Sequence, residues 1–109
     1  MIPIPSFAQS AGITQAVARA DVAYIKHRNP SASPKIGNVA YKAGYALTSW
    51  TNGETGGEDV FHYQRGAWHF IGGGGGVMDA ASMGSLYHVP PSISKDLVSQ
   101  MVSSMAKHR

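Results

Sequence analysis

Residues 58–71 read EDVFHYQRGAWHFI, and this stretch decides the fold. Two runs rich in β-branched and aromatic residues flank Gln64-Arg65-Gly66, a composition typical of two strands joined by a tight turn. With Arg65 and Gly66 as a two-residue turn, the pairs that face each other are Phe61–Phe70, His62–His69 and Tyr63–Trp68. The stretch therefore predicts an antiparallel hairpin with strands over residues 58–63 and 67–71.

Side chains alternate between the two faces of such a hairpin. One face carries aromatic side chains, namely Phe61, Tyr63, Trp68 and Phe70. We expect this face to meet the core, against a helix that precedes the strands. The opposite face carries Glu58, Val60, His62, His69 and Ile71. This second face is expected either to contact solvent or to be covered by a later segment.

The segment before the hairpin predicts a helix followed by weaker strands. A helix capped by Ser10 or Thr14 and running to about His27 places Ile13, Val17, Ala20 and Tyr24 on one apolar stripe. Asn29-Pro30 ends it, since proline disfavours a helical conformation at the preceding residue. Strands are then predicted over residues 36–42 and 45–50, so the sheet has three or four strands.

The segment after the hairpin begins with five glycines, Gly72–Gly76, which we expect to lead the chain out of the sheet. Asp79 is a suitable cap for a short helix that ends near Tyr87. A last amphipathic helix is predicted over residues 92–106. The fold class is therefore α+β: an N-terminal helix packed on an antiparallel meander, then a short helix and a C-terminal helix. Residues 12–109 form one domain, and residues 1–11 are a leader remnant or a disordered terminus.

Composition excludes several classes of protein. At 109 residues the chain can bury one core. Its net charge is +3, but the basic residues are scattered and the aromatic strands are the acidic part, so a nucleic-acid partner is not expected. The absence of cysteine excludes disulfides and thiolate chemistry. No apolar stretch is long enough to form a membrane span.

The amino end suggests export. Ser6-Phe7-Ala8 places small residues at the −3 and −1 positions of a cleavage site after Ala8. We therefore expect residues 1–8 to be the remnant of a secretory leader, and the protein to be periplasmic or secreted. The alternative is an ordinary proline-rich terminus.

A set of short motifs carries a family resemblance. They are Gly44-Tyr45-Ala46-Leu47, Trp50, Gly53-Glu54, Gly56-Gly57, Gly66-x-Trp68, Gly72–Gly76 and Val89-Pro90. Together they resemble small exported, mostly uncharacterised bacterial proteins whose domain is a helix followed by a glycine- and tryptophan-marked meander. In outline the arrangement is similar to a minimal cystatin- or NTF2-like sheet wrapped on a helix. The resemblance implies export and this fold, and it supplies no catalytic residue.

One candidate site is a metal centre. Directly opposed strand residues have Cβ atoms about 5 Å apart, so His62 and His69 could share one ion, with Glu58 supplying a carboxylate. Two imidazoles and a carboxylate suit zinc, copper or iron. The alternative is two histidines that face solvent.

The other candidate site is a binding surface. Aromatic residues beside glycines are common at interfaces, so the expected binding residues are Trp50, Glu54, Gly73, Gly74, Tyr87 and His88. The glycine run lacks the lysine and hydroxyl of a phosphate-binding loop. No motif with a catalytic mechanism is present, although Glu54, Glu58 and Asp59 cluster near one loop. The sequence favours a non-catalytic module that binds a protein partner or a second copy. A periplasmic metal-binding protein and a small hydrolase-like enzyme are the alternatives.

Overall fold

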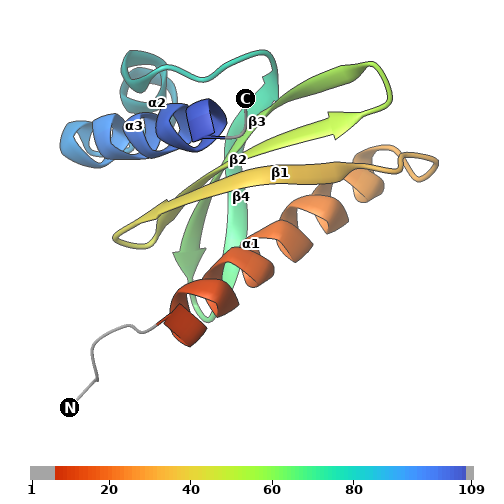
Figure 1. Ribbon diagram of the computed structural model, residues 1–109, viewed down its shortest axis with the longest axis horizontal. Coiled ribbons are helices and arrows are strands. Elements are labelled where there is room, and N and C mark those ends of the chain that lie inside the picture. Colours follow the sequence, from red (N-terminus) through yellow and green to blue (C-terminus); the bar gives the residue numbers. More distant parts are fainter. Residues whose placement is uncertain (1–6, 108–109) are drawn as a thin grey trace.

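The computed structural model describes residues 7–107, with side-chain environments for residues 12–104. The elements are α1 (Phe7–Arg28), β1 (Lys35–Lys42), β2 (Tyr45–Asn52), β3 (Thr55–Gln64), β4 (Ala67–Gly75), α2 (Ala80–Tyr87) and α3 (Pro91–Lys107). The four strands form one antiparallel sheet in the order β1-β2-β3-β4. Figure 1 shows α1 on one side of this sheet and α2 with α3 on the other. The predicted α+β fold is confirmed.

The first helix is longer than predicted. It begins at Phe7 rather than at a cap on Ser10 or Thr14, so residues 7–11, which the sequence placed outside the domain, are helical. It ends where predicted, because Pro30 follows the last turn, in which the Asn29 N–H donates to the Ile25 carbonyl over 2.9 Å. Residues 1–6, including part of the expected leader, lie outside the described residues.

The hairpin has the predicted register, with Phe61 opposite Phe70 and His62 opposite His69. Its aromatic face meets α1 as expected through Phe61, Trp68 and Phe70, but Tyr63, beside the turn, is 48% exposed rather than part of the core. There the buried residues Val17, Ala46 and Phe61 form one core, and Phe70 stacks on Tyr24 with ring centroids 3.8 Å apart.

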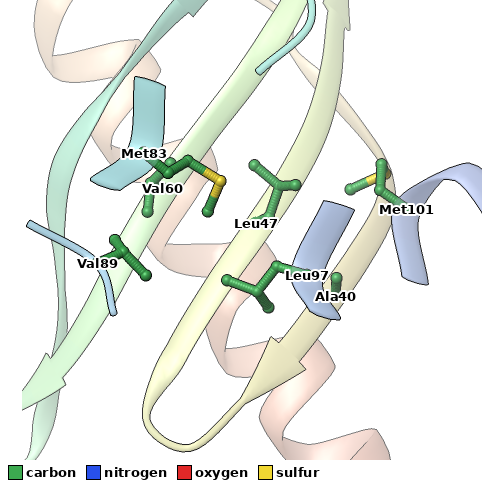
Figure 2. Close-up of a cluster of buried hydrophobic side chains, with 7 residues drawn as sticks. All are labelled: Ala40, Leu47, Val60, Met83, Val89, Leu97 and Met101. Carbon is green, nitrogen blue, oxygen red and sulfur yellow. The ribbon is translucent and has the colours of Figure 1, made fainter. Parts of the chain in front are cut away.

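The opposite face of the sheet is covered by the C-terminal helices. Its core consists of Ala40, Leu47, Val60, Met83, Val89, Leu97 and Met101 (Figure 2). Each large aliphatic side chain fully buried here contributes about 2 kcal/mol. Of the two outcomes predicted for the histidine face, covering by a later segment is therefore correct around Val60 and Ile71. His69, at the hairpin end, is exposed.

The glycine run was wrongly predicted to leave the sheet. Gly72–Gly75 extend β4 and pair with β3, from Val60 opposite Gly72 to Gly57 opposite Gly75. Ile71 is the extra residue of a bulge at this point. The strands run too close together for side chains, because a Cβ on Gly57 would overlap the carbonyl of Gly74. Glycine continues the strand here instead of ending it.

The short helix has its predicted cap. Asp79 accepts a hydrogen bond from the Ser82 N–H over 2.7 Å, which satisfies one of the free donors of the first turn. This bonding also lowers the pKa of Asp79. None of the helices within residues 7–107 is long and apolar enough to cross a membrane.

Candidate functional site

Two acidic side chains are buried between α1 and the sheet. Asp21 of α1 is 0% exposed and Asp59 of β3 is 2% exposed. Their positions follow from local structure. Asp21 lies one helical turn after the buried Val17, and Asp59 lies two residues before the buried Phe61 on the same face of β3. Carboxyl groups are rarely buried without a cation or strong donors, so this pair is unusual.

The pair has fewer hydrogen-bond donors than it needs. The Thr48 hydroxyl donates to Asp21 Oδ2 over 2.5 Å and lies 3.4 Å from the Asp59 carbonyl oxygen. Among the described residues, Asp21 Oδ1, Asp59 Oδ2 and Trp50 Nε1 are buried and make no hydrogen bond of good geometry, although Asp21 and Trp50 both lie close enough to Asp59 to change its pKa. Each such atom costs about 1–3 kcal/mol. A proton held between the two carboxyl groups would satisfy one acceptor on each of them.

Burial is the main reason that the pKa of Asp59 rises to about 8, and hydrogen bonding to and repulsion from Asp21 add to it. The Trp50 indole opposes the rise. At neutral pH Asp59 is therefore expected to hold a proton. The two acids titrate as a unit, so the pKa belongs to the pair.

A cavity of about 410 Å³ lies beside this pair. We call it the carboxyl-pair cavity. Its described lining comprises Tyr24, Ile25, Arg28, Asn29, Trp50, Asn52, Thr55, Asp59, Phe70 and Gly73–Gly75. Gly73 leaves room for the acid, because a Cβ at this position would overlap Asp59 Oδ1. Its φ of 145° is also one that other residues rarely adopt. The glycine run therefore helps to form the site.

The structure brings together three of the six expected binding residues. Trp50, Gly73 and Gly74 line the carboxyl-pair cavity. Glu54 lies in the exposed turn between β2 and β3. The other two belong to the end of α2: Tyr87 lies where a Cβ on Gly72 would be, and His88 is an exposed C-cap residue with a φ of 61°.

The three predicted metal ligands have separate environments. The His62 ring stacks on Tyr45 with centroids 4.1 Å apart, and His69 Nε2 lies 3.1 Å from the Gln64 carbonyl oxygen. Glu58 is buried further along the strand and accepts the Met78 N–H over 2.8 Å. Across the described side chains, no three His, Asp or Glu residues are grouped so that they could hold a metal ion. A metal bound by the two histidines alone stays a prediction.

The sequence did not identify Asp21 or Thr48, and it placed Asp59 in an acidic cluster near one loop. A signal was nevertheless present. Asp21 interrupts the apolar stripe between Val17 and Tyr24, and Thr48 and Asp59 alternate with core residues along their strands. A charged residue on an apolar stripe needs a partner, and that requirement identifies this site.

The geometry of the carboxyl-pair cavity is therefore the basis for any functional assignment. Comparison with models of known protein families, with curated proteins and with solved structures found no match.

Proposed function

We propose that this domain is a non-catalytic binding module and that its binding site is the carboxyl-pair cavity. The observation that carries the proposal is a set of buried polar atoms that make no hydrogen bond of good geometry, of which Asp59 Oδ2 and Trp50 Nε1 belong to the wall of a cavity of about 410 Å³. This volume lies within the range of small-ligand sites, which is about 300–1,000 Å³. A ligand that hydrogen-bonds these atoms would recover the free energy that their burial costs.

Stability alone does not account for the acidic pair. Well-packed apolar residues of similar volume are often as stabilising as buried charged groups, or more so. Asp21 and Asp59 are both acids, so neither neutralises the other. A pair that weakens the fold and borders a cavity is characteristic of a functional site.

The lining of the cavity is suited to binding. Its described residues include two amide side chains, three aromatic rings and bare glycine backbone beside Asp59. Amides and aromatic rings can orient a ligand.

The test is a titration of the full chain with a small-molecule fragment mixture, followed by ¹H–¹⁵N NMR. We expect shifts to cluster on the Trp50 indole N–H and the amides of Gly73–Gly75. Trp50→Phe should weaken the response, whereas Trp68→Phe is the matched control, because Trp68 lies outside this cavity. If no shifts appear at about millimolar fragment, the proposal is contradicted. This concentration corresponds to a binding free energy of only about 4 kcal/mol. Shifts that avoid the cavity would contradict it equally.

Association of two copies is a second candidate, and the contrast between the two sheet edges favours it. Gln100 of α3 closes the β1 edge by accepting the Tyr41 N–H over 3.1 Å and donating to the Tyr41 carbonyl over 2.9 Å. Within residues 7–107, β4 pairs only with β3, and Gly73–Gly75 leave bare backbone at its end. Two such edges can approach about a twofold axis without side chains between them.

Sedimentation velocity tests the second candidate. We expect a concentration-dependent dimer, with hydrogen-exchange protection of the β4 amides rising as the dimer forms. A strict monomer at high concentration would rule this candidate out and would leave the cavity proposal intact.

We also propose that the protein acts outside the cytoplasm. The small residues Ser6 and Ala8 and the resemblance to exported proteins support this location. Fractionation of cells that express the gene with its natural upstream sequence tests it. Recovery in the cytoplasmic fraction would contradict export.

A further inference from the structure

The unpartnered atoms of the carboxyl-pair cavity differ in kind. Asp59 Oδ2, an acceptor, and Trp50 Nε1, a donor, belong to residues of the cavity wall, whereas the buried Asp21 lies outside the described lining. A ligand that matches this wall must supply a donor to the Asp59 carboxyl group. A positively charged donor forms stronger hydrogen bonds to carboxylates than a neutral one does. The polar side of the cavity therefore favours a cationic ligand over an anionic one.

The aromatic side of the cavity favours the same charge. Tyr24 and Phe70 stack with ring centroids 3.8 Å apart, and Trp50 adds a third ring. Each ring of the stacked pair covers one face of the other, and the uncovered faces of such rings attract cations. Arg28 shows this directly, since its guanidinium carbon lies 5.8 Å from the Tyr24 ring centroid and its Nη1 donates to the Tyr24 hydroxyl over 2.7 Å.

The size of the cavity distinguishes an organic cation from a metal ion. Across the described side chains, no group of three His, Cys, Asp or Glu residues could hold a metal. The cavity, at about 410 Å³, has room for an apolar body as well as for a charged group.

We propose, building on the function proposed above, that the cavity binds a small organic cation with a primary ammonium group. The ammonium N–H groups donate to the Asp59 carboxylate, and the apolar body lies among Tyr24, Trp50 and Phe70.

Binding of this ligand releases a proton. The free pair holds one proton because burial raises the pKa of Asp59 to about 8. When the ammonium group binds, that carboxyl proton passes to solvent, and the ligand keeps its own proton because an alkylammonium group has a pKa near 10. Affinity therefore rises with pH until the free pair is deprotonated, at about pH 8.

Few other ionisable groups face Asp59. From α1 these are Asp21, which shares the proton, and Tyr24 and Arg28 at the cavity wall. The neighbouring strands contribute Thr48 and Trp50 of β2 and the glycines of β4, none of which titrates near neutral pH. The pH dependence of binding therefore reports on the carboxyl pair.

The experiment compares benzylammonium with benzyl alcohol, a neutral probe of similar shape. Isothermal titration calorimetry of the full chain near pH 6 and near pH 8, in buffers of different ionisation enthalpy, counts the protons released. NMR of the Trp50 indole N–H places the probe. We expect benzylammonium to bind at least about tenfold more tightly near pH 8, with release of up to one proton. We expect benzyl alcohol to bind weakly and independently of pH.

Variants test which side chains bind the ammonium group. Asp59→Asn should weaken benzylammonium binding by at least about tenfold and remove its pH dependence, and Asp21→Asn is the second variant should the first fail to fold. Glu58→Gln is the matched control, because Glu58 points to the opposite face of the sheet and its Met78 hydrogen bond is kept. Arg28→Gln removes a like charge at the rim and should tighten binding about twofold.

The outcomes separate the two proposals. Equal, pH-independent binding of both probes at the cavity overturns the ammonium assignment and leaves the binding cavity in place. A response of Trp50 to Mg²⁺ or Zn²⁺ alone, with none to benzylammonium, also overturns it. A cavity that responds neither to these probes nor to the fragment mixture overturns both proposals.

Discussion

Glu58 and Asp59 are neighbours in β3, and both are buried, yet their surroundings differ fundamentally. Glu58 points toward the α2 and α3 side and accepts the Met78 N–H over 2.8 Å. Asp59 points toward α1, where it meets a second acid, Asp21, and where its Oδ2 makes no hydrogen bond of good geometry. Burial alone therefore does not determine the role of a buried acid. The groups that face the acid determine its role.

The pKa of Glu58 and the pKa of Asp59 are both raised, but the consequences differ. Burial raises the pKa of Glu58, and the hydrogen bond from Met78 opposes that rise. This bond holds the segment between β4 and α2, which is a structural role. For Asp59, burial and Asp21 both raise the pKa, to about 8, so the group changes charge near neutral pH. Asp59 can therefore change its charge when a ligand binds near neutral pH.

The largest predicted effect comes from closing the space around Asp59. Gly73→Ala introduces a Cβ that overlaps Asp59 Oδ1 and the Glu58 carbonyl oxygen, at a φ unfavourable for alanine. We expect a loss of about 4 kcal/mol in the free energy of unfolding, from strain and overpacking together. Gly74→Ala is the matched control, since its φ is 150° but a Cβ there meets nothing within 4 Å. Urea denaturation of both variants checks the difference, and equal losses would contradict the account.

The next effect tests the structural role of Glu58. Glu58→Ala leaves the Met78 N–H without its partner, which should cost about 2 kcal/mol. Glu58→Gln keeps an acceptor oxygen at the same position and should cost well under half as much. Denaturation near pH 7 measures both variants. Similar losses for the two substitutions would show that the hydrogen bond is not what this side chain contributes.

The third prediction concerns pH and stability. An acid whose folded pKa is raised takes up a proton on folding, so its contribution is present at low pH and is lost as pH rises from about 4 toward 8. We expect the unfolding free energy of the wild type to fall by roughly 1 kcal/mol per pH unit relative to Asp59→Asn over this window. Denaturation curves from about pH 5 to pH 8 give both slopes. Parallel slopes would contradict a raised pKa at this residue.

The sequence predicted the elements and register well, because periodicity and turn residues are local signals. The hairpin pairing of Phe61 with Phe70 and the cap at Asp79 followed from such signals. The prediction for the glycine run was wrong because the pairing of this run depends on a second glycine segment, at Gly56 and Gly57. The proximity of the two segments is a tertiary property. The Asp21–Asp59 pair was missed for the same reason. Its members lie far apart in sequence, and only the packing of α1 on the sheet brings them together.

One measurement tests the contrast between the two acids most directly. It is the titration of the Asp59 side-chain carboxyl carbon by ¹³C NMR. The account predicts a midpoint near pH 8 for the pair, with Asp59 reporting it, and a lower midpoint after Asp21→Asn removes the second acid. The Asp79 carboxyl, whose pKa its hydrogen bonds lower, serves as the internal reference for an acid with donors. An Asp59 midpoint at the ordinary value of about 4 would contradict the account, because the pair would then hold no proton at neutral pH.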